Sequence, residues 1–174
     1  FPSYMEWTAQ ACRILKNHKL EQEMFLKVIH GRVPVTGAKE TIEILKNKGY
    51  KTALITGTFN VLAQRAKTEL GIDHTVSHCE LIFDNKGYLA DWKLIPCDFA
   101  GKIDYFHKLL KKLGFTPQES VYVGDEINDI PMFKEACLSM AFNCSKPEVK
   151  EAADIVVESS DLRDTLQHIT KAVY

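Results

Sequence analysis

The order of apolar and polar positions predicts helices and strands that alternate at short spacing over most of the chain. Apolar residues recur on one helix face, with a glycine just past each helix end, in residues 38–48, 60–70 and 102–113. Short apolar runs predict buried strands at residues 50–55, 121–123, 138–142 and 155–157. Such alternation is typical of an α/β fold, in which helices cover both faces of a parallel sheet.

Two segments depart from that alternation. Residues 1–31 are mainly helical in pattern, with two amphipathic faces separated by a polar interruption at residues 17–19. Residues 75–83 and 88–94 are strand-like and flank a turn sequence at 84–87, which predicts a β-hairpin inserted into the core. The remaining helices are expected in residues 133–136, from Pro147 onward, and in residues 161–173.

Length, net charge and cysteine content favour a globular domain that binds neither nucleic acid nor membranes. The 174 residues suffice for one domain with a buried core, and the net charge of −1 gives no reason to expect binding to nucleic acid or to an anionic membrane. No apolar run approaches the length of a membrane span. The five cysteines are widely spaced and form no CxxC pair, so we expect free thiols in a reducing compartment, the cytoplasm.

The segment that follows the strand at residues 121–123 carries the most specific chemistry. Gly124 allows a sharp turn at the end of that strand. Four oxygen-bearing side chains follow at once, those of Asp125, Glu126, Asn128 and Asp129. Ligands of α/β sheets bind at the carboxyl ends of strands, and Mg²⁺ prefers oxygen ligands. The same residues also fit a solvated loop in which Asp129 starts the next helix, and the segment alone leaves both interpretations open.

Two further segments, at the start of predicted helices, carry groups that phosphoryl transfer requires. Thr56-Gly57-Thr58 follows the strand at 50–55 and opens a helix, so its N–H groups and a hydroxyl form an anion site, although hydroxyl helix caps are common. Lys102 opens the helix before the acidic strand and can reach a phosphate, although most single lysines are merely solvated. Phosphoryl transfer requires a metal, positive charge and in-line positioning, so the combination is more specific than any one member.

The motifs Thr56-Gly57-Thr58-Phe59, Lys102 and Gly124-Asp125-Glu126-Ile127-Asn128-Asp129, in this order, resemble motifs two, three and four of the haloacid dehalogenase (HAD) superfamily. The chain is most similar to the phosphoserine phosphatase-like enzymes of that family, from Val35 to about Leu166. The resemblance implies a Rossmann-like, HAD-type parallel sheet with helices on both faces and the hairpin as an insertion. It also implies a small or incomplete helical cap in residues 1–32 and a core domain in residues 33–174.

By this resemblance, each candidate site residue has a role in a Mg²⁺-dependent reaction. Thr56 would hydrogen-bond the transferring phosphoryl group, and Lys102 would neutralise that group and the nucleophile. Asp125 would bind Mg²⁺, and Asp129 would support the metal site. The residues that would bind the phosphate are Thr56, Gly57, Thr58, Lys102 and Asn128.

One motif of the family is missing. Its members carry Asp-x-Asp at the end of the central first strand, where the first aspartate attacks phosphorus and the second is the general acid and base; the sequence contains no Asp-x-Asp. Without that strand, the strands at 52–55 and 121–123 would have unpaired buried backbone groups, which is costly. We therefore expect a strand from upstream of Phe1 or from another chain to fill a slot between them. Residues 1–174 alone should then fold poorly and hydrolyse no phosphate ester.

The leading hypothesis is a Mg²⁺-dependent phosphatase that hydrolyses a small, phosphoserine-like phosphomonoester through an aspartyl-phosphate. The alternative is a catalytically inactive HAD-like binding module. A receiver-type signalling domain is disfavoured because the acidic loop comes last, and a dinucleotide site because no GxGxxG follows any strand. The phosphatase hypothesis predicts that Thr56, Lys102 and Asp125 converge on one crevice.

Overall fold

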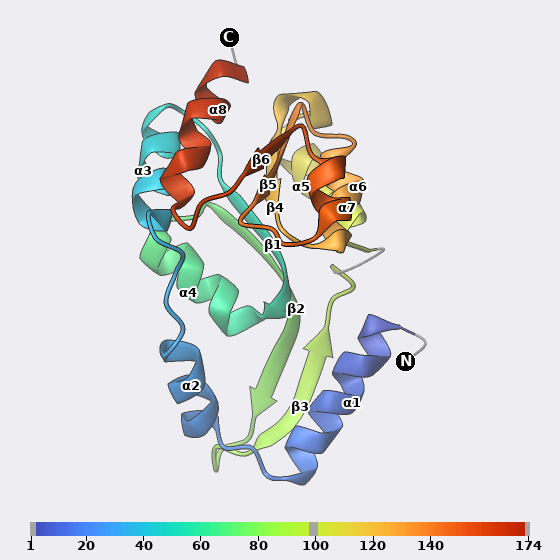
Figure 1. The fold of residues 1–174 in the computed structure, drawn as a ribbon. Helices are drawn as coiled ribbons and strands as arrows, with labels where there is room; N and C mark the ends of the chain where they lie inside the picture. Colours follow the sequence, from blue (N-terminus) through green and yellow to red (C-terminus); the bar gives the residue numbers. More distant parts are fainter. Residues whose placement is uncertain (1–2, 98–100, 173–174) are drawn as a thin grey trace. The chain divides into compact units, whose positions relative to one another are not determined.

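The computed structural model describes residues 3–97 and 101–172 (Figure 1). Tertiary contacts divide the chain into two compact units, of which unit 1 comprises residues 1–34 and 53–98, and unit 2 comprises residues 35–52 and 99–174. Each unit contains a three-stranded sheet. No helix in the described residues is long and apolar enough to cross a membrane.

The sheet of unit 1 has the strand order β1-β2-β3, formed by Ala53–Phe59, His74–Phe83 and Leu89–Leu94. β1 and β2 are parallel, with Ala53 opposite His74, whereas β2 and β3 form an antiparallel hairpin. Helix α4, Asn60–Leu70, connects β1 to β2 and packs against both strands. The predicted hairpin is therefore confirmed, and it makes this sheet mixed rather than wholly parallel.

Two helices precede the sheet in unit 1, α1 (Tyr4–Asn17) and α2 (Gln22–His30). Ser3 caps α1, because its side-chain oxygen accepts a hydrogen bond from the N–H of Glu6 at 3.2 Å. Arg65 of α4 donates from one guanidinium nitrogen to the carbonyl oxygens of Ile29 and Arg32, at 2.8 and 2.9 Å. These bonds satisfy carbonyl groups at and just after the end of α2, which have no partner within the helix.

The sheet of unit 2 is wholly parallel, with the order β4-β5-β6, formed by Val121–Gly124, Leu138–Phe142 and Ile155–Val157. Its α-helices are α3 (Ala38–Asn47), α5 (Lys102–Leu113), α6 (Ile130–Phe133), α7 (Pro147–Ala152) and α8 (Leu166–Ala172). Its short 3₁₀ helices are η2 (Pro117–Glu119), η3 (Ile127–Asp129) and η4 (Leu162–Thr165).

Apolar clusters lie on both faces of the unit 2 sheet because alternate residues of a strand point to opposite faces. Ala141 of β5 packs with Phe133 of α6 and Val149 of α7. Its neighbour Met140 packs with Ile169 of α8 on the other face. Figure 1 shows α6 and α7 on one side of β4–β6, and α3 and α8 on the other. Helices on both faces of a parallel sheet are the predicted architecture, and unit 2 confirms it.

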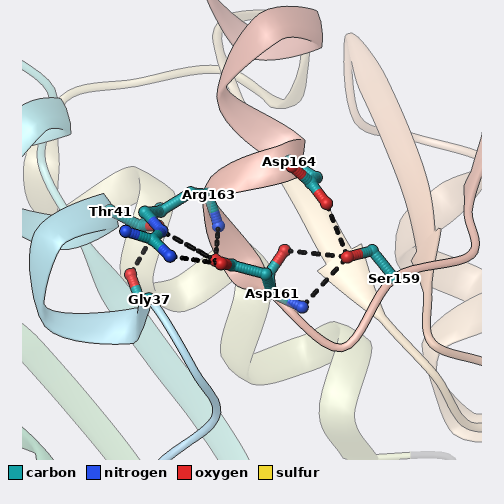
Figure 2. A network of polar contacts seen from close by, with 6 residues as sticks. All are labelled: Gly37, Thr41, Ser159, Asp161, Arg163 and Asp164. Atoms are coloured by element: carbon teal, nitrogen blue, oxygen red, sulfur yellow. Dashed lines mark hydrogen bonds and ion pairs between the residues drawn. The ribbon is translucent and has the colours of Figure 1, made fainter.

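A polar network in residues 159–164 lies beside the start of α3 in unit 2 (Figure 2). Asp161 accepts hydrogen bonds from the backbone N–H and from Nε of Arg163, at 3.0 and 2.9 Å. Ser159 donates to Asp164 at 2.5 Å and accepts from the N–H of Asp161 at 3.0 Å. Gly37, just before α3, has a φ of +73°, and a Cβ there would stand 2.8 Å from Cγ of Arg163. The chain can pass this network only because residue 37 is glycine.

Most elements begin and end within two residues of their predicted bounds. The helix predicted at 133–136 is α6 at Ile130–Phe133, and the helix predicted at 161–173 is divided into η4 and α8. The first strand of unit 1 also differs from its prediction. We predicted a strand at residues 50–55 that ends before Thr56-Gly57-Thr58, which we interpreted as a turn into the next helix, whereas β1 runs from Ala53 to Phe59. Threonine and phenylalanine favour extended backbone, so the strand continues through the predicted turn. The register with β2 becomes irregular between Thr56 and Phe59.

β1 and β4 each lie at an end of their sheet order and so have one hydrogen-bonded neighbour among the described strands. Direct pairing of β1 with β4 would have contradicted the idea of a missing strand, and the residues that the structure describes show none. The slot and the strand expected to fill it stay a prediction. So does the division into a cap of residues 1–32 and a core of residues 33–174.

Candidate active site

The carboxylate of Asp129 is the centre of the acidic loop in unit 2. Its Oδ1 accepts hydrogen bonds from Nζ of Lys102 at 2.6 Å and from the hydroxyl of Tyr122 at 2.9 Å. Its Oδ2 accepts from the backbone N–H groups of Asp125 and Glu126, both at 3.0 Å. Asp129 is 3% exposed, so these four donors take the place of water around a buried negative charge.

The loop closes on Asp129 because residue 124 is glycine. A Cβ at Gly124 would stand 2.5 Å from Oδ2 of Asp129. The sequence predicted a sharp turn at this position. The structure gives a further reason for glycine there, which is the close approach of a carboxylate to the backbone at the end of β4.

Lys102 reaches the acidic loop from the first residue of α5. It is 7% exposed, and its ammonium group forms an ion pair with Asp129. Desolvation opposes the attraction between two buried charges, and removal of either partner would leave a costly unpaired charge. Asp129 has three other donors, and an ammonium group carries three N–H donors of which Asp129 takes one. Lys102 is thus a fixed positive charge with further donor capacity.

Unlike the buried Asp129, Asp125 is accessible to solvent over part of its surface. Partial burial raises the pKa of the Asp125 carboxyl above its usual range, and the nearby charges of Asp129 and Glu126 raise it further. Glu126 forms an ion pair with Lys146. The backbone of Asp125 is held by the thiol of Cys144, which donates to its carbonyl oxygen at 3.1 Å. Asp125 is therefore an acid on a fixed backbone whose negative charge a nearby cation would stabilise.

The oxygen atoms of the loop fit part of a Mg²⁺ coordination shell. Mg²⁺ usually takes one or two carboxylates and completes its shell with waters and phosphate. Asp125 offers an exposed carboxylate, and Asn128 has a buried amide oxygen. Asp129 already accepts four hydrogen bonds, so its oxygens suit a supporting role better than direct ligation. Within the described ranges, no group of three or more His, Cys, Asp or Glu side chains could hold a metal ion by itself.

The predicted phosphate-binding residues Thr56, Gly57 and Thr58 lie in unit 1, at the carboxyl end of β1 and just before α4. The hydroxyl of Thr56 accepts a hydrogen bond from the N–H of Thr58 at 3.3 Å. The carbonyl oxygen of Thr56 accepts from the thiol of Cys97 at 3.5 Å, and that of Gly57 from the hydroxyl of Tyr4 at 3.4 Å. The convergence of this segment with Lys102 and Asp125 stays a prediction.

The structure brings Lys102, Asp125 and Asp129 together within unit 2. Sequence reasoning missed Tyr122, which it treated only as part of a buried strand end. A signal was present, because a tyrosine hydroxyl that is buried in a strand usually finds a hydrogen-bond partner. An acidic loop that starts two residues later offers such a partner, but the pattern alone does not say which acid.

The profile of the haloacid dehalogenase-like hydrolases matches residues 6–136 of the chain. The chain belongs to the haloacid dehalogenase-like hydrolases. The matched part of this HAD chain includes Thr56, Lys102 and the acidic loop through Asp129. Its α/β architecture, with a parallel sheet and helices on both faces, is that of its structural neighbours in the family.

Within the HAD family, the chain is similar to phosphoserine phosphatases. One from Methanocaldococcus jannaschii is 39% identical over 150 residues, which cover 82% of this chain and 67% of the relative. One from Archaeoglobus fulgidus is 33% identical over 160 residues, which cover 91% and 45%. A solved structure of a phospho-aspartyl intermediate analogue of phosphoserine phosphatase has a TM-score of 0.83 at 36% identity, covering 95% of this chain and 77% of that one. The chain spans about half to two thirds of the length of these two curated relatives.

Proposed function

We propose that the natural polypeptide containing this chain is a Mg²⁺-dependent phosphatase that hydrolyses a small phosphomonoester such as phosphoserine. The observation that carries the proposal is the acidic loop, in which the buried Lys102–Asp129 pair stands beside the exposed acid Asp125. Similarity to phosphoserine phosphatases over most of the chain supports this choice of substrate.

In the proposed reaction, an aspartate outside residues 1–174 attacks phosphorus and the ester P–O bond breaks. The alcohol leaves with a proton from a second acid, and water then cleaves the aspartyl-phosphate to release inorganic phosphate. Lys102 balances the charge on the phosphoryl oxygens, and the hydroxyl of Thr56 hydrogen-bonds one of them. The N–H groups of Gly57 and Thr58, at the carboxyl end of β1, bind the phosphate, and the amide of Asn128 orients it.

Asp125 is the residue of this chain that would hold Mg²⁺, with Asp129 supporting the loop. When bound, the ion supplies positive charge to the oxygens of the transferring group. Lys102 contributes a second positive charge from a different element, and the Asp129 carboxylate limits its movement.

We place this enzyme in the cytoplasm and assign it a small phosphorylated metabolite as its partner. The five cysteines are free thiols, which suits a reducing compartment. A net charge of −1 gives no electrostatic reason to expect nucleic acid as a ligand. Fractionation of source cells, with immunodetection of the protein, tests the location.

The release of inorganic phosphate from phosphoserine and from a generic aryl phosphate, with Mg²⁺ and with a chelator, tests the proposed activity. We expect Asp125→Ala to abolish the metal-dependent rate with an unchanged circular dichroism spectrum, because that carboxylate serves the ion rather than the core. Glu151→Ala is the matched control, since Glu151 is an exposed acid on α7 outside the loop. Near wild-type turnover by Asp125→Ala at saturating Mg²⁺ would refute the assignment.

The wild-type rate separates the phosphatase from the alternative, an inactive HAD-like binding module. A wild-type protein that hydrolyses no phosphomonoester, and whose gene encodes no Asp-x-Asp strand upstream of Phe1, would favour the binding module. Detection of that strand together with turnover would favour the phosphatase.

A further inference from the structure

We infer that Tyr122 is a positioning residue for the proposed reaction, whose hydroxyl holds the Asp129 carboxylate in the orientation that places Lys102. The inference rests on the proposed function and adds to it a residue of β4 that makes no contact with the reacting atoms itself. It starts from the hydrogen bond of 2.9 Å between the Tyr122 hydroxyl and Oδ1 of Asp129.

The ring of Tyr122 is held from two sides by aromatic residues. Its centroid lies 5.8 Å from that of Phe106, with an angle of 84° between the ring planes, and 5.9 Å from that of Phe133, with an angle of 69°. Phe106 and Phe133 are themselves buried. Edge-on packing of this kind is favourable and leaves the ring little freedom. The core of unit 2 therefore determines where the hydroxyl of Tyr122 lies.

The same contacts connect Tyr122 to Lys102 by two routes, one through Asp129 and one through Phe106 and helix α5. Phe106 stands one turn after Lys102 on α5, so both residues project from one face of that helix. The ring of Tyr122 contacts Phe106, its hydroxyl binds Asp129, and Asp129 binds Lys102 at 2.6 Å. A change in the orientation of Asp129 is therefore passed directly to the ammonium group of Lys102.

The two side-chain donors share one oxygen of Asp129, and the two backbone donors share the other. Without its Tyr122 partner, Oδ1 would have Lys102 as its remaining side-chain donor, and the carboxylate could turn toward the ammonium group. That turn would loosen the bonds from Oδ2 to the N–H groups of Asp125 and Glu126. The same turn would also move the ammonium group of Lys102. In the proposed reaction this group stabilises the transition state only when it is correctly placed, so we expect the substitution to change kcat rather than KM.

The test uses Tyr122→Phe, which removes the hydroxyl and keeps the ring between Phe106 and Phe133. Thr165→Val is the matched control. Thr165 is 1% exposed, and its hydroxyl donates to the carbonyl oxygen of Leu162 at 2.7 Å, so the control removes one buried hydrogen bond of unit 2 away from the loop. Both changes are made in the full natural polypeptide.

Two measurements are taken on each variant. The first is hydrogen exchange at the amides of Asp125 and Glu126, followed by NMR, and the second is steady-state hydrolysis of phosphoserine with saturating Mg²⁺. We expect Tyr122→Phe to speed exchange at both amides about tenfold and to lower kcat about tenfold, with KM within about twofold, as for the loss of a hydrogen bond to a charged group. Thr165→Val should leave the two amides and kcat at their wild-type values.

Unchanged exchange at these two amides in an active Tyr122→Phe enzyme would overturn the inference. So would an equal loss of kcat in both variants, since this would indicate general destabilisation rather than positioning. A wild-type protein without any phosphatase activity, in which the two amides still respond to Tyr122→Phe, would contradict the proposed function and uphold the link from Tyr122 to the loop.

Discussion

In two networks of unit 2, an aspartate forms an ion pair with a positively charged side chain, and the two networks differ most in burial. In the acidic loop, Asp129 and Lys102 are 3% and 7% exposed. In the network of Figure 2, the side chain of Arg163 is 51% exposed and pairs with Asp161 at 2.5 Å. Solvent screens an exposed pair, whereas a buried pair keeps both charges in fixed positions.

The two networks also differ in what their side chains contact. The Arg163–Asp161 pair lies where the chain enters α3, and its side chains approach the backbone of Gly37 closely. The Lys102–Asp129 pair holds two successive N–H groups of the loop that bears Asp125, an exposed acid whose pKa is raised. We therefore treat the network of Figure 2 as structural and the acidic loop as the candidate functional site.

The largest effect is expected from Lys102→Met. The substitution leaves the carboxylate of Asp129 buried without its cation, which should cost about 3–5 kcal/mol in the free energy of unfolding. Loss of the positive charge should also lower kcat about 100-fold or more. Urea unfolding and steady-state kinetics measure the two effects. A stability loss below about 1 kcal/mol would show that the buried pair is not what distinguishes the loop.

Gly37→Ala should have an intermediate effect on the other network. Its φ of +73° is unfavourable for alanine, and the new Cβ would meet the side chains of Asp161 and Arg163. We expect a loss of about 1–3 kcal/mol in the free energy of unfolding, with kcat unchanged when it is measured well below the melting temperature. A specific loss of kcat in a folded Gly37→Ala protein would contradict the structural role of this network.

Asp125→Asn should stabilise the protein without divalent cations. Because the folded-state pKa of Asp125 is raised, the native protein keeps a proton that the unfolded chain loses above the ordinary pKa of 3.8. Stability therefore falls as pH rises through that window and stays lower above it. Melting temperatures from pH 4 to pH 8 in a chelator should show the advantage of the variant growing with pH. A variant that melts below wild type across the range would show that the charge of Asp125 is already stabilised.

The smallest effect is expected from Arg163→Met, which is the counterpart of Lys102→Met in the exposed network. Exposed ion pairs contribute little to stability, and salt screens them further. The melting temperature should change little, the difference should shrink in high salt, and kcat should stay at the wild-type value. Losses as large as those of Lys102→Met would remove the contrast between the two networks.

The sequence predicted most of the fold because its apolar periodicity and its helix-ending glycines mark the elements directly. It also marked Lys102, Asp125 and Asp129, which the structure brings together in unit 2. It could not assign the four donors of Asp129, because these join α5, β4 and the loop across the fold. For the same reason, Tyr122 looked like an ordinary strand residue. The strand at Thr56 was misjudged because local turn signals were outweighed by strand propensity.

Mg²⁺ binding to the natural polypeptide, measured by titration calorimetry on wild type and on Asp125→Asn, tests the central claim most directly. That claim is that the buried pair keeps Asp129 occupied and leaves Asp125 to receive the cation. We predict a saturable isotherm for wild type and an affinity at least about tenfold weaker for the variant, since even loss of a residue outside the ligand set commonly costs that much. Equal affinities in the two proteins would contradict the claim.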